Sequence, residues 1–268
     1  LFNSVQYMVL VGPQLYLKHT AFGVIQRISR LLESDDEVDE LLKMSNVMAV
    51  TRLKYNDHGV VHAKIVAGTS LELLELLLKR NVELTTLRDG ITKSLDEVRV
   101  IIFLSAYLHD IGNAVHRSNH EYVGALIAKD IVDRVLRKAL DIYDRRLISI
   151  RQEVLHSIYA SGYEAECLTV ECSITKLADG LDMSEGRARI PYKLGKVDMH
   201  AVSALSIKRV EIDSGERPIK VSVYMDDSAG LFQLERVLIP KIMGSLIKDL
   251  VEIYISTQGK VFKYYPRE

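Results

Sequence analysis

Histidines dominate the residues of this chain that could do chemistry. The pairs His58/His62 and His116/His120 are each four residues apart, a spacing that places both imidazoles on one face of a helix. Such a pair can bind one metal ion, although helical histidines also cap carbonyls or lie on the surface. Six of the eight histidines fall within about a third of the chain: His58, His62, His109, His116, His120 and His156. This clustering indicates a metal site without establishing one.

Two acidic positions stand beside apolar segments. His109 and Asp110 follow the apolar run 101–108, and Asp179 lies within the apolar run 174–181. An unpaired imidazole or carboxylate next to a dry interior is costly to bury, and a metal ion would remove that cost. Lys176, one turn before Asp179, is the competing structural partner for this carboxylate.

Helical periodicity covers most of the chain before residue 203 and predicts the elements that position these side chains. Apolar residues recur three and four apart in the segments 14–32, 38–53, 59–79, 94–110, 119–139, 144–159 and 166–183. Ser94 and Glu97 have the spacing of a capping box, and the acidic stretch 34–39 offers another N-terminal cap. Gly112 and Gly162 suit helix ends.

The pattern changes near residue 203. Segments 207–212 and 219–224 alternate around a turn at 214–218, 231–250 is helical, and 251–256 and 261–265 alternate again. Pro240 is expected to kink or interrupt its helix. The sequence therefore predicts a mostly α protein with a helical domain over 1–203 and a small C-terminal α+β subdomain of ββαβ order over 204–268.

Composition limits the class of partner and the compartment. The chain has 48% hydrophobic residues and a formal net charge of -1, which excludes disorder and disfavours binding to nucleic acid or anionic lipid. No apolar run is long enough to cross a membrane. Cys167 and Cys172 are too few for a disulfide framework or a thiolate zinc site, and we expect both to be reduced in a cytoplasmic protein.

The order of His62, the doublet His109-Asp110 and then Asp179 resembles the HD-domain superfamily of metal-dependent phosphohydrolases. The local contexts resemble that family as well, in His62-Ala63-Lys64, in Leu108 to Gly112 and in Ala178 to Asp182. His120 and His156 stand where the dinuclear members, including the HD-GYP phosphodiesterases, carry extra histidine ligands. The resemblance covers residues 55–192 and implies an HD-type helical core.

The chain departs from the HD-GYP branch in ways that bear on the substrate. His156 is followed by Ser157 and Ile158, and only Gly162-Tyr163 remains of the GYP motif, so cyclic di-GMP is not an expected substrate. Asn113 replaces a lysine of that branch. The resemblance implies that Arg187 and Arg189, together with Asn113, contact the phosphate, because arginine pairs well with phosphate oxygens.

The resemblance also implies a metal-activated hydroxide that cleaves a small, nucleotide-type phosphoester. Imidazole and carboxylate ligands favour Mn or Fe, with Co, Ni or Zn as alternatives. We expect two ions, the first held by His62, His109 and the two carboxylates, with Asp110 bridging to the second and Asp110 and Asp179 as catalytic residues. Asp182 is expected to orient a ligand histidine. The expected metal ligands are His62, His109, Asp110, His120, His156 and Asp179.

Several alternatives stay open at this point. His58 is either a ligand of an extra ion or a helix cap, and His116 either meets substrate or lies on the surface. The enzyme could instead be a diiron oxygenase of the same superfamily, or the domain could be a non-catalytic nucleotide sensor. The C-terminal subdomain is expected to form a homodimer or to shield the mouth of the pocket.

Overall fold

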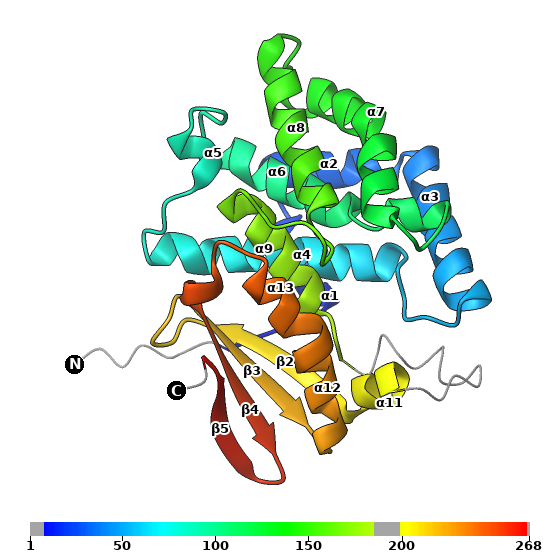
Figure 1. Ribbon diagram of the computed structural model, residues 1–268. Helices are drawn as coiled ribbons and strands as arrows, with labels where there is room; N and C mark the ends of the chain where they lie inside the picture. Colours follow the sequence, from blue (N-terminus) through cyan, green and yellow to red (C-terminus); the bar gives the residue numbers. More distant parts are fainter. Residues whose placement is uncertain (1–7, 185–198, 267–268) are drawn as a thin grey trace.

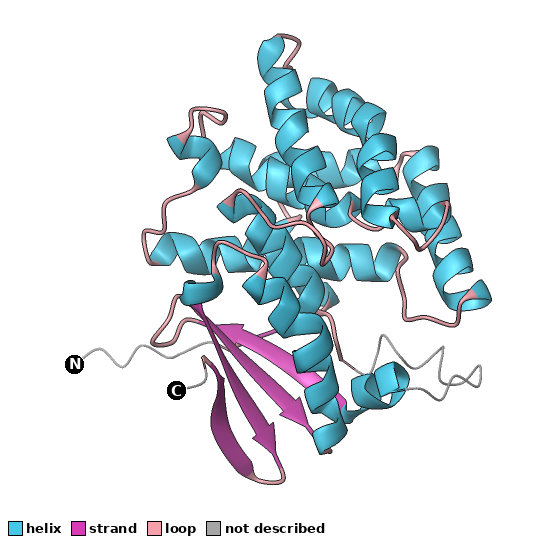
Figure 2. Ribbon diagram, in the orientation of Figure 1, coloured by secondary structure: helices cyan, strands magenta, loops and turns pink. Residues whose placement is uncertain are grey.

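The computed structural model describes residues 8–184 and 199–266 as a helical body with a sheet at one end (Figures 1 and 2). The predicted fold class, a mostly α protein with an HD-type helical core and a small C-terminal α+β part, is confirmed. The helices before residue 184 are α1 (Pro13–His19), α2 (Gly23–Glu33), α3 (Asp36–Asn46), α4 (Val60–Lys79), α5 (Thr85–Arg88), α6 (Leu95–Leu108), α7 (His120–Leu140), α8 (Arg145–Tyr159) and α9 (Val170–Leu181).

The first two helices differ from the sequence-based prediction at their ends. The segment 14–32 is divided into α1 and α2, and Gly23 begins α2 with a φ of 74°, a conformation that favours glycine. Helix α3 starts earlier than expected because the Asp35 side chain accepts hydrogen bonds from the amides of Glu37 and Val38. After Asn46 the chain continues as a π-helical segment, Val47–Arg52.

Helix α6 is the centre of the helical body. Ser94 caps its first turn by accepting a hydrogen bond from the amide of Glu97, as the capping box predicts, whereas the Glu97 carboxylate reaches the amide of Lys93. Every residue from Val100 to Leu108 is buried, and α4, α8 and α9 pack around the helix. The apolar run therefore delivers His109 and Asp110 to the interior, at the end of a helix that packing holds in place.

The sheet has five strands in the order β1-β2-β3-β4-β5. Neighbouring strands are antiparallel except β3 and β4, whose parallel pairing requires a crossover connection. The strands expected after residue 203 are confirmed, but β1 comes from the opposite end of the chain and was not predicted. The strands are β1 (Val9–Leu10), β2 (Ile207–Asp213), β3 (Ile219–Met225), β4 (Val251–Thr257) and β5 (Lys260–Tyr265).

The crossover between β3 and β4 is a helix in three parts: α12 (Leu231–Gln233), a π-helical segment (Leu234–Leu238) and α13 (Ile239–Met243). Pro240 lies in the first turn of α13, where its missing N–H is tolerated, and the helix changes there from π to α winding without a break. The helix ends at Met243 and not near residue 250 as expected. It packs between the sheet and α9 (Figure 1).

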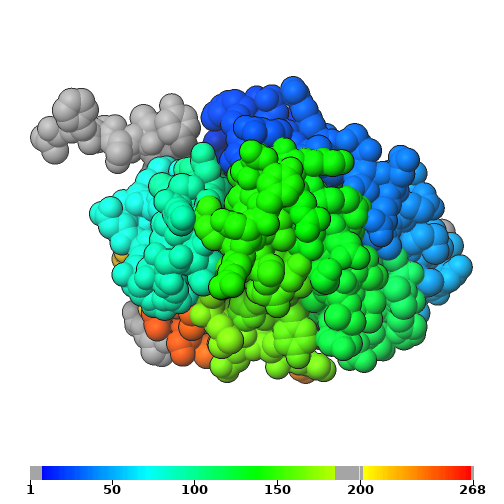
Figure 3. All heavy atoms as spheres, turned by 90° about the horizontal axis from the view of Figure 1, so that it is seen from above, coloured from blue at the N-terminus to red at the C-terminus, as the bar shows by residue number. Residues whose placement is uncertain are grey.

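One hydrophobic core joins the two parts of the chain. Buried residues of α4, α6 and α9 belong to the same cluster as buried residues of β2, β3 and β4. Helix α11 (Met199–Ser206) leads into the sheet. Seen from the side opposite the sheet, the surface is formed mainly by helices of the first 180 residues, with α7 and α8 at its centre (Figure 3). The division at residue 203 stays a prediction.

The expectation of two reduced cysteines is wrong. Cys167 and Cys172 form a disulfide, with Cα atoms 5.6 Å apart, and both residues are buried. The bond ties the loop after α8 to the first turn of α9. Composition alone could not reveal it, because pairing depends on how the loop returns to the helix.

No helix in the described ranges is both long enough and apolar enough to cross a membrane.

Candidate metal centre

Three helices bring the HD-type residues together. His62 lies in the first turn of α4, His109 and Asp110 directly follow α6, and Asp179 lies in the last turn of α9. The Nε2 atom of His62 is 3.1 Å from Asp179 Oδ1, 3.3 Å from His109 Nε2 and 3.4 Å from Asp110 Oδ2. His109 Nε2 is 3.4 Å from Asp110 Oδ2 and 3.6 Å from Asp179 Oδ1. Residues up to 117 positions apart in sequence, His62 and Asp179, therefore lie in contact.

Hydrogen bonds on the far side of each imidazole fix its orientation. His62 Nδ1 donates to Asp182 Oδ2 at 2.6 Å, and His109 Nδ1 donates to the Ala106 carbonyl at 2.8 Å. Both rings thus direct Nε2 towards the carboxylates of Asp110 and Asp179. The expected contact of Asp182 with a histidine of the cluster is confirmed.

The donor set fits a divalent cation. Burial by itself lowers the pKa of His109, but the carboxylates of Asp110 and Asp179 outweigh burial and raise this pKa to about 10. Burial alone would raise the pKa of Asp110, yet His109 and His58 hold it well below its ordinary value. The cluster therefore requires positive charge at its centre, and a metal ion can replace the proton that otherwise supplies it. Imidazole nitrogen with carboxylate oxygen suits Mn, Fe, Co, Ni or Zn.

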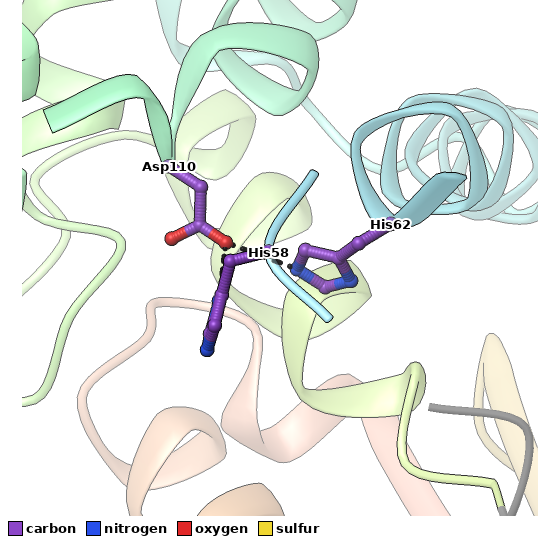
Figure 4. Close-up of side chains that lie close together, drawn as sticks. All are labelled: His58, His62 and Asp110. Carbon is purple, nitrogen blue, oxygen red and sulfur yellow. Dashed lines mark hydrogen bonds and ion pairs between the residues drawn. The ribbon is translucent and has the colours of Figure 1, made fainter. Parts of the chain in front are cut away.

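Two further histidines flank Asp110. His58 Nδ1 lies 2.7 Å from Asp110 Oδ2, and His120 Nε2 lies 3.4 Å from Asp110 Oδ1. Figure 4 shows His58 and His62 directed at the Asp110 carboxylate. Among the described residues, the sets of three that could hold an ion are His58 with His62 and Asp110, and His62 with His109 and Asp179. His58 thus faces the cluster, which the sequence left open.

His156 is not brought to this cluster. It lies in the last turn of α8, where its Nε2 accepts a hydrogen bond of 3.1 Å from the amide of Leu168, and burial lowers its pKa. The loop that carries Leu168 is the one tied to α9 by the disulfide. The His156 imidazole therefore binds the backbone of this loop.

The residues expected to contact substrate have different placements. Asn113 is buried and donates its amide to Asp110 Oδ1 at 2.9 Å, so it holds the carboxylate in place. Arg187 and Arg189 lie outside the described residues. His116 is exposed, and its Nδ1 accepts a hydrogen bond from the amide of Ser118.

A cavity of about 420 Å³ opens beside Asp110 and Asp179. Its wall includes the aromatic rings of Tyr55 and Tyr163, which are 40% and 52% exposed, and the cationic side chain of Arg117. Gln233 and Val237, with Lys241, line it from the crossover helix. The C-terminal part therefore forms one wall of the cavity.

Lys241 is a site residue that the sequence did not reveal. Its buried ammonium group donates to Asp179 Oδ2 at 2.7 Å and to the Ser161 carbonyl at 2.7 Å, and lies 4.9 Å from the centre of the Tyr163 ring. Lys176, the partner considered from the sequence, instead donates to the Ala165 carbonyl. Lys241 is 62 residues from Asp179 and carries no local motif, so only the packing of α13 on α9 reveals the pair.

A buried His/Asp cluster at the ends of packed helices defines a metal-binding helical domain. The family model for the HD domain matches residues 57–184. The chain is 43% identical over 233 residues to the uncharacterized protein MJ1020 of Methanocaldococcus jannaschii, a match that covers 87% of this chain and 89% of that relative. No solved structure matches the chain. The chain belongs to the HD-domain superfamily of metal-dependent hydrolases.

Proposed function

We propose that this protein is a metal-dependent phosphohydrolase that cleaves a small phosphoester of the nucleotide type. The observation that carries the proposal is the convergence of His62 and His109, 3.3 Å apart, with the carboxylates of Asp110 and Asp179, each within 3.6 Å of both histidines, beside an open cavity. The HD domain over residues 57–184 supports the same class of reaction.

His62, His109, Asp110 and Asp179 would hold a divalent transition metal, with Mn or Fe as the first choice from the donor set. Such an ion supplies Lewis acidity, which lowers the pKa of a water molecule and polarises a phosphoryl oxygen. Other residues of the chain set the orientation of the metal ligands. Asp182 and the Ala106 carbonyl fix the two imidazoles, and Lys241 holds one oxygen of Asp179 so that the other faces the cluster.

The cavity wall supports a nucleotide-type substrate. Tyr55 and Tyr163 expose aromatic rings on the cavity, and such rings can stack on a planar base. Lys241 adds a positive charge beside Tyr163. A nucleotide presents a base and a phosphate, which match these two features.

The experiment is a phosphoester panel run on chelated protein reloaded separately with Mn, Fe, Co and Mg. We expect phosphate release that requires a transition metal. His109→Ala should reduce both metal content and activity by at least roughly 100-fold, because even removal of a residue that only supports a ligand costs 10- to 100-fold. His116→Ala, on an exposed histidine outside the cluster, is the matched control.

Other results of the same panel would replace the proposal. Unchanged metal content and activity in His109→Ala would eliminate this site. Substrate-dependent oxygen uptake without phosphate release would favour a diiron oxygenase, and tight nucleotide binding without turnover would favour a sensor. The homodimer through the C-terminal part and the cytoplasmic location stay predictions. Sedimentation of the full chain would test the homodimer.

A further inference from the structure

We infer that Arg117 occupies the place of a second metal ion, so that the chain binds one ion and uses the Arg117 guanidinium to bind the phosphate of the substrate. The inference rests on the proposed function and changes the expected number of ions from two to one. It depends on what surrounds the second oxygen of Asp110.

Asp110 is poorly placed to bridge two cations. Its Oδ2 atom faces His58, His62 and His109, at distances of 2.7, 3.4 and 3.4 Å. Its Oδ1 atom accepts the amide N–H of Asn113 at 2.9 Å. A bridging carboxylate needs Oδ1 for the second ion, and here the Asn113 amide already occupies one of the two acceptor positions of this atom.

His120 is turned towards the guanidinium. Its Nδ1 lies 3.0 Å from the Arg117 carbonyl and 2.9 Å from Glu121 Oε2, so it carries the proton. In the neutral imidazole that carries its proton on Nδ1, Nε2 is an acceptor, and Arg117 Nη1 lies 3.1 Å from it. The same Nη1 is 4.0 Å from Asp110 Oδ1. A positive group of the protein thus lies beside both the imidazole and the carboxylate that would bind a second ion, and a dication would be repelled there.

The remaining ligands do not form two separate sites. The two sets of described residues that could hold an ion both contain His62. Since His62 Nδ1 donates to Asp182, only Nε2 can bind a metal, and one lone pair serves one ion. His156, the other expected ligand, accepts a hydrogen bond from Leu168 instead.

Arg117 is positioned to bind an anion as well. Asn113 Oδ1 accepts from Nη1 at 3.1 Å and anchors the side chain, which is 34% exposed and lines the cavity. Its contacts within the described chain all use Nη1, whereas a guanidinium carries five N–H donors. The other donors can therefore pair with phosphoryl oxygens, in the role that a second ion would have had.

The first experiment counts ions. Chelated protein is titrated with Mn²⁺ by calorimetry, and the metal content after gel filtration is measured by mass spectrometry. We expect one ion per chain. Two ions per chain in the wild-type protein would overturn the inference, and if that protein still hydrolyses phosphoesters the proposed function stands. A wild-type protein without metal and without activity would instead remove the proposed function itself.

The second experiment measures the binding of inorganic phosphate to Mn-loaded protein by calorimetry, beside KM for the best substrate of the panel. Arg117→Met should weaken phosphate binding and raise KM by roughly 10- to 100-fold, the effect of one charge-assisted hydrogen-bonded pair. Arg117→Lys should restore part of the affinity. Arg137→Met, on the exposed side of α7, is the matched control and should change neither value. Unchanged phosphate affinity and KM in Arg117→Met would overturn the phosphate role.

Discussion

Single hydrogen bonds decide which lone pairs face the metal centre. The 2.6 Å bond between His62 Nδ1 and Asp182 Oδ2 is the clearest case, because it selects the tautomer of His62 and fixes the ring. Asp182 acts on the metal centre through His62, so it can be substituted without removing an expected metal ligand. This makes Asp182 a sharper test of the centre than any residue inside it.

Asp182→Asn should lower the affinity for Mn²⁺ by about 10- to 100-fold, because the amide no longer holds the imidazole N–H with a charged acceptor. Calorimetric titration of the chelated protein measures the change. Asp130→Asn, on an exposed aspartate paired with Lys129, is the matched control and should leave affinity unchanged. Equal affinities in all three proteins would mean that His62 is oriented by its packing and not by Asp182.

The same cluster makes the stability of the metal-free protein depend on pH. The pKa of His109 rises from 6.5 to about 10 on folding, so its contribution is complete below pH 6.5 and disappears as pH rises through 10. The pKa values of Asp110 and Asp179 lie well below 3.8, so their contribution is present above pH 3.8 and is lost as pH falls further.

We therefore expect the free energy of unfolding of the chelated protein to decline between pH 6.5 and pH 10. Urea unfolding at a series of pH values measures this decline. His109→Gln should abolish most of it, since glutamine does not titrate. A flat profile in the wild-type protein over this range would contradict the charge pairing of His109 with Asp110 and Asp179.

At the scale of elements, the site depends on close contact between the turn after α6 and the start of α7. Gly112 lies in the 3₁₀ segment Ile111–Ala114, and a Cβ atom there would lie 2.5 Å from the Gly124 amide nitrogen and overlap the His120 carbonyl. Both obstacles are backbone atoms, which cannot rotate away. The glycine thus lets α7 approach Asp110.

Gly112→Ala should destabilise the protein by about 3 kcal/mol or more and should separate His120 from Asp110. Urea unfolding measures the loss. Gly90→Ala is an informative control because Gly90 has a φ of 72° but nothing near its missing Cβ, so only the backbone penalty of about 1 kcal/mol applies. Equal losses at both positions would show that close packing at Gly112 is unimportant.

The contact between α13 and α9 is electrostatic as well as apolar. Lys241 is buried and Asp179 is partly buried, and the ammonium and carboxylate groups are 2.7 Å apart. Lys241→Met removes the ammonium partner of a carboxylate that keeps His62 and His109 beside it, so it should cost about 1–3 kcal/mol in the chelated protein. The cost should shrink in an Asp179→Asn background, and Lys248→Met, on an exposed lysine, should cost little. Additive losses in the double mutant would contradict the pairing.

On the scale of the whole molecule, the helical body and the sheet share one core, and β1 from the start of the chain pairs with β2. We expect a single unfolding transition, since neither part can open without exposing the core of the other. Hydrogen exchange should therefore protect β3 and α6 to a similar degree. Independent opening of the sheet at lower denaturant would instead support two separately folding domains.

Local patterns determined the parts of this protein that depend on neighbours in sequence. The apolar spacing predicted α4, α6 and the strands after residue 203, because helix and strand periods are properties of a few consecutive residues. The order of His62, His109-Asp110 and Asp179 indicated the family and the metal chemistry, since the residue types alone limit which ions they can bind.

Only the tertiary structure decided which distant groups meet. The pairing of Lys241 with Asp179, the place of Arg117 beside His120, the separation of His156 from the cluster and the pairing of β1 with β2 have no local signature. Each depends on the rotation of one helix or strand against another, which packing of the whole core sets. A lysine or histidine on a helix looks the same in sequence whether its side chain reaches the metal centre or a neighbouring loop.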